Sequence, residues 1–313
     1  ACAQGTDLVY VVSRDGGLHS FDPGELRFRR IGTLDCPGTS RSLPHSMAVD
    51  RSGQAWVGYD NGVVALVSIT NAACVPSNVN VRGARIGRRF GMGFAPTSEG
   101  GIGGETLFLT TEPIFRAFED SRGVLHGSSL LARIDDGRNI KVAAEFPPEL
   151  RGLSGELSSR ADGKLFAFFT GDPFQIAEID PTTADVRWRK KLQGMRFTET
   201  GTGSWAFAAV GSDFFFFWAD RNSASTVTRL KEDGTLEHVI KDAGMEIVGA
   251  GASTCATSKS APLALPKASD ETPAPPPPAA PPPPVTPPIT PAPPSGKLPK
   301  LPPLPPPKKT PPK

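Results

Sequence analysis

The stretch SMAVDRSGQAWVGYDNGVVALVSI (residues 46–69) contains three short apolar runs that are separated by the turn sequences RSG and NG. Runs of this length, rich in β-branched and aromatic residues and punctuated by glycine, predict antiparallel strands joined by hairpins. A weaker fourth run follows at residues 73–79. Residues 46–79 are therefore predicted to form one four-stranded antiparallel sheet.

The same four-run unit recurs three times along the chain. It lies at residues 89–146, 155–192 and 204–242, whereas patterns with the period of a helix are almost absent. Four-strand units that repeat at intervals of roughly 50 residues are typical of the blades of a β-propeller. The sequence therefore predicts an all-β repeat protein.

The two ends of the repeat region supply the parts of one further blade. Residues 7–34 contain strands two to four of a unit without its first strand, and residues 246–254 form an isolated first strand. A blade built from both ends leaves no exposed edge in the ring. We therefore expect a β-propeller of five four-stranded blades, closed by N- and C-terminal strands. Six blades are the alternative, because an insertion near residues 112–128 could conceal another hairpin.

Proline divides the chain into two parts. Residues 258–313 contain 24 of the 34 prolines and carry a charge of +5, which leaves residues 1–257 at −3. Such a proline-rich segment cannot bury a core, and it predicts a disordered polyproline-II spacer. We expect an N-terminal segment (1–4), a propeller domain (5–257) and a proline-rich tail (258–313). Because LPKLPPLPPPKK resembles the ligands of SH3-like modules, docking of the tail on a partner is the alternative to a plain spacer.

Charge and hydropathy exclude two classes of protein. The small negative charge of residues 1–257 argues against nucleic-acid binding. No stretch approaches the ~20 apolar residues that a transmembrane helix needs, so no transmembrane segment is expected.

Four cysteines indicate an oxidising compartment. Cys36 and Cys74 occupy matching places in TLDCPG and NAACVP, while Cys2 and Cys255 flank the repeats. We predict the disulfides Cys36–Cys74 and Cys2–Cys255, with four buried free thiols as the alternative. The Ala-Cys start also resembles the cleavage junction of bacterial lipoproteins, so lipidation of Cys2 is a second possibility. Disulfide formation and lipidation of Cys2 both predict a secreted or cell-envelope location.

The sequence PHSMAVDRSGQAWVGYDNG (residues 44–62) resembles the repeat of the streptogramin-lyase and gluconolactonase propellers. The overall layout also resembles uncharacterised secreted propeller-like proteins of myxobacteria. The first resemblance implies a site at the mouth of the central channel, with a histidine acid/base and a divalent cation held by acidic residues.

Candidate ligand-binding residues stand where each first strand begins, because loops enter the channel of a propeller there. They are His45, Arg89 (or its neighbour Phe90), Glu156, Ser204 and Glu246. His45 and Glu156 are also the candidates for a catalytic base and a ligand of Ca²⁺ or Mg²⁺. The remaining acidic or amide ligands of such a site are missing at the corresponding entries, so no metal site and no cofactor is predicted. A salt bridge at the channel rim is the alternative role of Glu156 and Arg89.

The absence of a recognisable catalytic motif favours a binding module over an enzyme. We expect a non-enzymatic, secreted or surface-anchored propeller that binds a protein or glycan partner or acts as a scaffold. A metal-dependent lyase or lactonase with its site at the channel mouth is one alternative. A structural component of a cell-surface assembly, in which the tail docks neighbours, is the other.

Overall fold

A computed structural model describes residues 2–79, 81, 86–87, 89–96, 104–111, 129–198 and 203–256, together with the backbone of 118–119 and 125–126. The predictions for residues 258–313 lie outside the described residues. In the described part no helix has the length and apolar character needed to cross a membrane.

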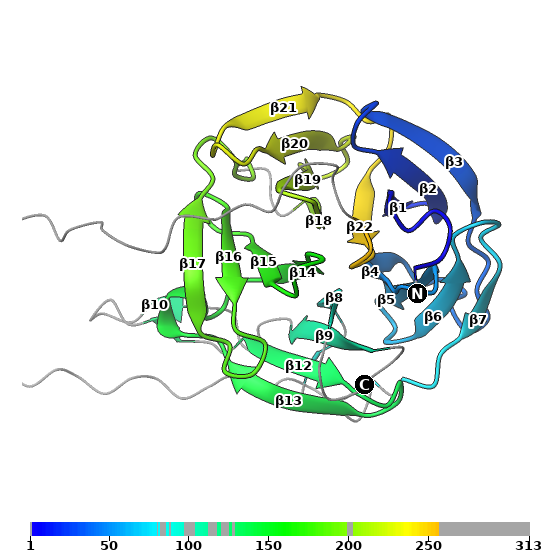
Figure 1. Ribbon diagram of the computed structural model, residues 1–313, viewed down its shortest axis with the longest axis horizontal. Coiled ribbons are helices and arrows are strands. Elements are labelled where there is room, and N and C mark those ends of the chain that lie inside the picture. Colours follow the sequence, from blue (N-terminus) through cyan, green and yellow to red (C-terminus); the bar gives the residue numbers. More distant parts are fainter. Residues whose placement is uncertain are drawn as a thin grey trace, which may run out of the picture. The chain divides into compact units, whose positions relative to one another are not determined.

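Five four-stranded antiparallel sheets surround a central axis as the blades of a propeller (Figure 1). From the axis outward, blade 1 consists of β22 (Ile247–Ala252), β1 (Val9–Ser13), β2 (Gly17–Asp22) and β3 (Arg27–Thr33). Blade 2 consists of β4 (Pro44–Val49), β5 (Gln54–Tyr59), β6 (Val64–Ser68) and β7 (Cys74–Pro76). Blade 3 consists of β8 (Phe90–Pro96), β9 (Glu105–Thr111), β12 (Leu130–Ile134) and β13 (Ile140–Glu145).

Blade 4 consists of β14 (Gly155–Ser159), β15 (Leu165–Phe169), β16 (Gln175–Ile179) and β17 (Val186–Lys191). Blade 5 consists of β18 (Ser204–Val210), β19 (Asp213–Ala219), β20 (Thr226–Leu230) and β21 (Leu236–Ile240). The predicted count of five blades is confirmed. The predicted closure is confirmed as well, because β22 pairs antiparallel with β1 and supplies the missing first strand of blade 1.

The insertion in blade 3 does contain an additional hairpin. Its strands, β10 (Phe118–Glu119) and β11 (Leu125–His126), pair only with each other in a separate two-stranded sheet. A 3₁₀ turn, η1 (Pro148–Leu150), leads from blade 3 to blade 4. The hairpin therefore adds no sixth blade to the described part of the ring.

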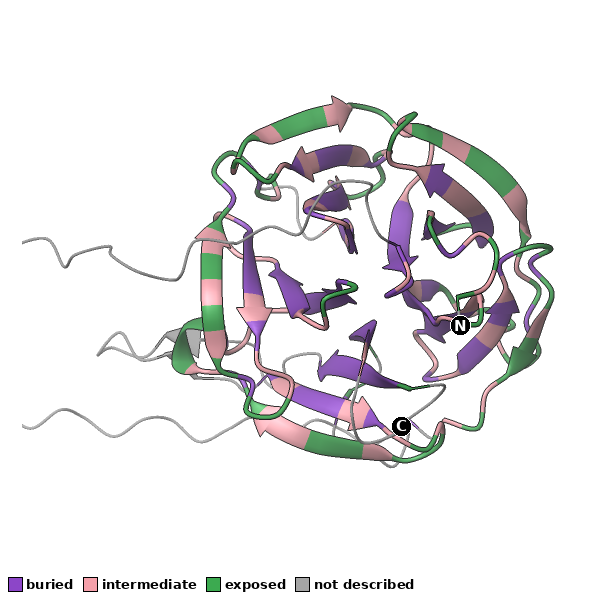
Figure 2. Cartoon of the chain, in the orientation of Figure 1, coloured by how far each residue is buried: buried purple, intermediate pink, exposed green. Residues whose placement is uncertain are grey.

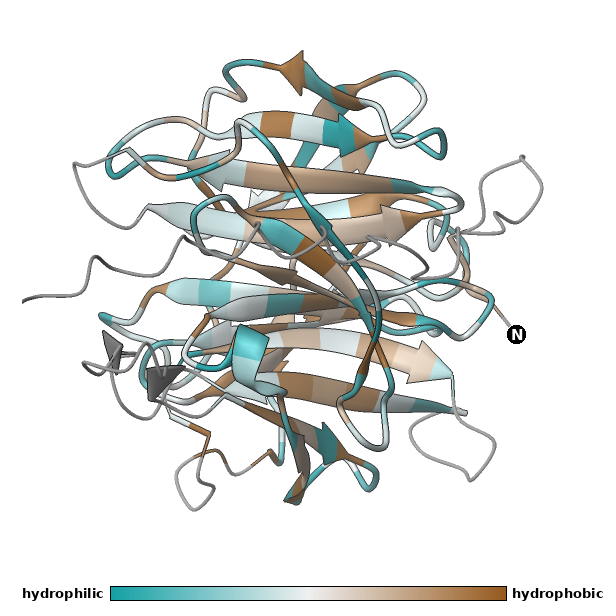
Figure 3. Ribbon diagram, turned by 90° about the vertical axis from the view of Figure 1, so that its left-hand side faces the viewer, coloured by the Kyte–Doolittle hydropathy of each residue, from teal (hydrophilic) through white to brown (hydrophobic). Residues whose placement is uncertain are grey.

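Burial decreases from the axis outward (Figure 2). The second strands are buried on both faces because a neighbouring blade covers each face, whereas outer strands such as β17 alternate between half-buried and exposed residues. The exposed positions of β17 are arginines and a lysine, and hydrophilic and hydrophobic residues are mixed along the strands in the side view of Figure 3. The blades therefore bury apolar surface between them and present polar outer strands.

The aromatic run of β19 shows how one strand contacts two neighbouring blades. Phe214 packs against Phe166 of blade 4, with ring centroids 4.8 Å apart. Phe215, which points to the other face, packs at 5.5 Å against Phe21 of blade 1. Since successive residues of a strand face opposite ways, the run fills both inter-blade cores. These aromatics therefore pack between blades.

The five inner strands approach one another closely around the axis. A Cβ atom on Gly91 of β8 would lie 2.1 Å from the carbonyl oxygen of Gly155 on β14. A Cβ atom on Gly249 of β22 would lie 2.9 Å from the carbonyl carbon of Ser46 on β4. Only glycine allows backbones to come this close. The glycines of the inner strands therefore keep the ring narrow enough for five blades.

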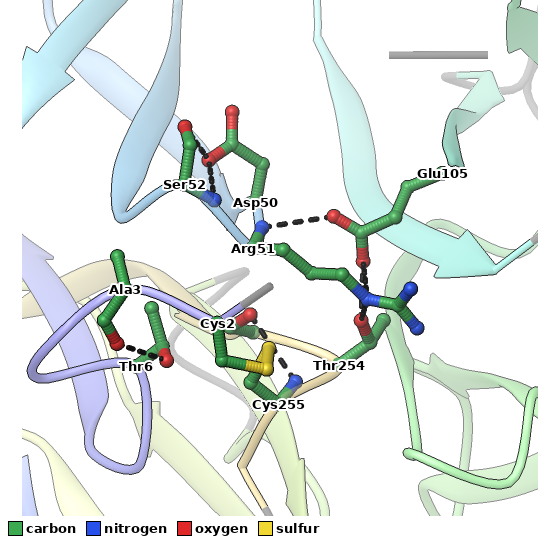
Figure 4. The surroundings of a disulfide bond; sticks show 10 residues. Cys2, Ala3, Thr6, Asp50, Arg51, Ser52, Glu105, Thr254 and Cys255 are labelled. Atoms are coloured by element: carbon green, nitrogen blue, oxygen red, sulfur yellow. Dashed lines mark hydrogen bonds and ion pairs between the residues drawn. A yellow bond between two sulfur atoms is a disulfide. The ribbon is translucent and has the colours of Figure 1, made fainter. Parts of the chain in front are cut away.

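Both predicted disulfides are present. Cys36–Cys74 joins blade 2 to the loop before it, with a Cα–Cα distance of 5.3 Å. Cys2–Cys255, with a Cα–Cα distance of 5.9 Å, joins the segment before β1 to the segment after β22 (Figure 4). Cys2 therefore stands here as a half-cystine, not as a free thiol available for lipidation.

Candidate functional site: the hollow at the channel mouth

A hollow of about 550 Å³ opens where the inner strands begin. Every inner strand contributes to its wall, through Pro44 of β4, Phe90 of β8, Gly155 of β14, Ser204 of β18 and Val248 of β22. Ligand pockets of proteins typically measure ~300–1,000 Å³ and favour such concave places. We refer to it below as the mouth hollow.

Four of the five predicted ligand-binding residues line the mouth hollow. They are His45, Arg89, Glu156 and Ser204. Glu246 is not part of the wall; its carboxylate holds Arg14 through two contacts of 2.5 Å, and Arg14 does line the hollow. The structure thus brings together residues that are up to 159 positions apart in the sequence, while their binding role remains a prediction.

His45 owes its orientation to a β-bulge. The register of β4 and β5 shifts between Pro44, opposite Tyr59, and Ser46, opposite Gly58, so His45 is the extra residue. A bulge re-aims the side chain at that position. The imidazole turns toward blade 3, where its Nε2 accepts a hydrogen bond of 3.2 Å from the backbone N–H of Phe90.

The protonation state of His45 follows from its surroundings. Burial, with the Arg89 guanidinium nearby, lowers the pKa of the imidazole from 6.5 to about 3. The ring is therefore neutral near pH 7, and because Nε2 accepts a hydrogen bond, the ring proton lies on Nδ1. Nδ1 is buried and has no hydrogen-bond partner in the structure. His45 thus presents an unused donor, while its one basic nitrogen is already occupied.

Glu156 is a carboxyl group inside the ring. Its Oε2 accepts a hydrogen bond of 2.7 Å from Ser46 Oγ, and Ser46 Oγ in turn accepts the N–H of Met92 at 3.0 Å. The residue is 4% exposed. Burial raises the pKa of Glu156 well above its usual value, although the hydrogen bonds from Ser46 and Met92 partly oppose the shift. The protonated, uncharged form is therefore favoured to higher pH than in a solvated glutamate.

Two neighbouring residues of β18 add further polar atoms without partners. Ser204 Oγ and Trp205 Nε1 are buried, and neither has a hydrogen-bond partner in the structure. Both residues belong to the wall of the mouth hollow. A buried polar group without a partner costs ~1–3 kcal/mol, so a site that keeps several of them needs an explanation.

The charged groups of the wall are unevenly paired. Arg89 is exposed, and none of the ion pairs found among the described residues includes it. Glu156 also takes part in none of these ion pairs, so the alternative role of a rim salt bridge is not seen for either residue in the described part of the chain. Asp60 also lines the hollow, and its Oδ1 accepts a hydrogen bond of 3.2 Å from the backbone N–H of Leu43.

The described residues do not suit a divalent cation. They contain no group of three or more histidine, cysteine, aspartate or glutamate side chains that could hold a metal ion. At the mouth, His45 Nε2 already accepts a hydrogen bond, and burial disfavours the charged form of Glu156 that Ca²⁺ or Mg²⁺ would require. The donor set implied by the lyase and lactonase resemblance is thus not assembled here.

The opposite end of the inner strands holds a second buried carboxylate, and it is fully partnered. Glu105 of β9 accepts the backbone N–H of Arg51 at 2.8 Å and the hydroxyl of Thr254 (Figure 4). The Arg51 guanidinium donates to Thr254 Oγ1 at 2.7 Å. Beside the Cys2–Cys255 disulfide, this network ties blades 2 and 3 to the segment after β22. Its groups satisfy one another, so its role is structural.

Among the lining residues that the sequence analysis did not single out are Arg14, Asp60 and Trp205. Arg14 could have been found. Once β22 is expected to pair antiparallel with β1, the residue after β1 must lie beside the residue before β22, which is Glu246. Asp60 and Trp205 carry no signal in the sequence that separates them from ordinary turn and packing residues.

Comparison with known proteins supports no family assignment. No family model matches the chain, and no curated protein matches it in sequence. Membership of the streptogramin-lyase or gluconolactonase family therefore stays a prediction.

Solved structures resemble the chain distantly. A chain of a nidogen/laminin complex shares 11% identity at a TM-score of 0.47, over 80% of this chain and 99% of that one. A protein of unknown function from Bacteroides caccae shares 10% identity at a TM-score of 0.42, over 78% and 97%. The Pan2 WD40 domain of Neurospora crassa shares 10% identity at a TM-score of 0.37, over 80% and 66%.

Proposed function

We propose that this protein is a non-enzymatic binding module that takes part of its partner into the mouth hollow. The observation that supports this proposal is the coincidence of a 550 Å³ hollow with three buried polar atoms that lack partners, on His45, Ser204 and Trp205. A bound partner would supply the missing hydrogen bonds. The hollow is built on inner strands that pack backbone to backbone. Because this wall is already ordered, the protein loses little conformational entropy when a partner binds.

The chemistry of the wall favours binding over catalysis. The one basic nitrogen of His45 is occupied by the N–H of Phe90, so the imidazole has no free site for a substrate proton. Glu156 has a raised pKa, and its Oε2 is held by Ser46. The wall thus holds one carboxyl group that favours its protonated form, Glu156, but no free basic nitrogen beside it.

A protein or glycan partner outside the cytoplasm fits the rest of the molecule. Two disulfides are compatible with a secreted or envelope protein, because disulfides persist in oxidising compartments. The proline-rich tail would then act as a spacer or as a docking segment for neighbours.

One observation favours the enzymatic alternative. Glu156 is a buried carboxyl with a raised pKa at a concave site, which is a common property of general acids. An acid-catalysed lyase or lactonase remains the second candidate, without the metal ion that its family would bring.

The test is an array of immobilised glycans and peptides, probed with the full-length protein. We expect captured ligands to be lost from Ser204→Tyr, which fills the hollow, and from Arg89→Glu, which leaves the fold untouched because Arg89 is exposed. Arg29→Glu on β3 is the matched control, since Arg29 is exposed on an outer strand. Ligands that bind all variants equally would contradict recognition at the mouth, and turnover of a captured ligand would establish the enzymatic alternative.

A further inference from the structure

The groups that the mouth hollow leaves unused are nearly all hydrogen-bond donors. Neutral His45 offers Nδ1–H, and the indole of Trp205 can only donate. Ser204 Oγ can donate or accept. Five N–H groups of the Arg89 guanidinium add to them, and none of these is held by an ion pair among the described residues.

Three carboxyl groups in and beside the wall have oxygens that are already engaged or disfavoured as acceptors. Asp60 Oδ1 receives the N–H of Leu43. Glu246, beside the hollow, is held by both contacts to Arg14. Glu156 Oε2 receives the hydroxyl of Ser46, and its burial opposes a negative charge inside the ring. A ligand that could only donate hydrogen bonds would therefore compete with these contacts.

From this asymmetry we infer that the mouth hollow binds a carboxylate. The inference deepens the proposed binding function and rests on it. A carboxylate brings two acceptor oxygens and one negative charge, which match the donors of His45 and Ser204 and the free guanidinium of Arg89. Arginine suits this task because its planar fork can donate two parallel hydrogen bonds to one carboxylate.

The size of the hollow limits the ligand. A volume of 550 Å³ lies within the ~300–1,000 Å³ of pockets that hold drug-sized ligands, so the hollow admits a small molecule or the last residues of a peptide. Phe90 lines the hollow and packs edge-on against His45 with ring centroids 4.8 Å apart, so an apolar surface lies next to the donors. The ligand we infer is thus a small organic acid with an apolar or ring-shaped body. It is either free or the terminal carboxylate of a peptide partner.

The experiment is calorimetric titration of the full-length protein with matched probes. Benzoate is compared with benzamide, and a hexapeptide ending in phenylalanine with a free carboxylate is compared with its C-terminal amide. We expect each acid to bind at least roughly tenfold more tightly than its amide, because a charge-assisted hydrogen bond is lost in the amide. Tight binding of benzoate alone would identify a free acid, and tighter binding of the peptide would identify a chain terminus.

Two variants keep the inference falsifiable. Arg89→Gln should weaken the acids roughly tenfold and leave the amides unchanged, whereas the exposed control Arg29→Gln should change neither. Equal binding of acids and amides, binding that is insensitive to Arg89→Gln, or no binding of either acid would each overturn the inference. The array described above stays independent of this result, since a neutral ligand lost from Ser204→Tyr would still support a binding module.

Discussion

Glu156 of β14 hydrogen-bonds Ser46 of β4, with 2.7 Å between Oε2 and Oγ, although a whole blade separates the two strands in sequence. The N–H of Met92 on β8 reaches the same Ser46 oxygen. One carboxyl group thus connects the inner strands of blades 2, 3 and 4. Its charge state therefore bears on the stability of the ring.

Glu156 is expected to make the protein less stable as pH rises. Its folded pKa is raised by burial, so the folded state holds this proton at pH values where the unfolded chain, with a pKa of about 4.3, has lost it. The contribution of Glu156 to the free energy of unfolding is fully present below about pH 4, and it declines as the pH rises toward the pKa of the folded state.

Glu156→Gln keeps an uncharged partner for Ser46 and removes this slope. In urea unfolding between pH 4 and 8, the free energy of unfolding of the variant should rise relative to that of the wild-type protein as the pH rises. The exposed control Glu149→Gln should follow the wild type. A pH-independent difference between Glu156→Gln and wild type would contradict the raised pKa.

His45 is expected to stay neutral down to low pH. Because its pKa in the folded protein is about 3, nitrogen chemical shifts of the imidazole should not titrate between pH 5 and 8. The shifts should identify Nδ1 as the protonated nitrogen, since Nε2 accepts the N–H of Phe90. An inflection near pH 6.5, as in an unperturbed histidine, would contradict the buried environment.

Gly91→Ala is expected to destabilise the ring severely. The new Cβ would lie 2.1 Å from the carbonyl oxygen of Gly155, so β8 and β14 would have to separate. Overpacking of this kind costs about 3 kcal/mol or more when backbone must move. Gly171→Ala is the matched control, because its nearest atom is 3.4 Å away. Denaturant unfolding of the two variants should differ accordingly, and similar midpoints would show that the inner ring can expand.

Removing the Cys2–Cys255 disulfide is expected to cost more than removing Cys36–Cys74. The two bridges close loops of 253 and 38 residues, and a longer loop restricts the unfolded chain more. Replacement of each pair by serine should cost ~2–5 kcal/mol, with the first pair toward the upper end. Unfolding curves of the two double variants decide the order, and a larger loss for the Cys36–Cys74 pair would show that local contacts outweigh chain entropy.

The repeat and its closure could be predicted because they depend on periodicity alone. Hairpin turns, four-strand units and the lone strand β22 all leave short-range signals, and the isolated first strand at the end of the repeats had one place to pair. The positions of His45, Arg89, Glu156 and Ser204 around one hollow followed from the same reasoning.

The contacts of these residues could not be predicted from the sequence. The bulge at His45 interrupts the alternation of side chains between the two faces of the sheet. Nothing in the sequence PHSMAVD indicates where the strand pairing shifts its register. The partner of Glu156 lies 110 residues away on a strand that is not its neighbour, so the contact exists only once the ring is closed. The long-range pairing of side chains is a property of the assembled ring.

Cys2 and Cys255 stand on the two segments through which the chain enters and leaves the ring. Tension applied along the chain outside them passes from sulfur to sulfur, and the sheets bear none of it. Without that bond the load would fall on the β1–β22 ladder at the pair Val9 and Ala252. There the two strands would be pulled apart from one end, breaking hydrogen bonds one after another, which is the weakest way to load a sheet. The disulfide therefore protects the β1–β22 ladder from being separated by a force on the two ends of the chain.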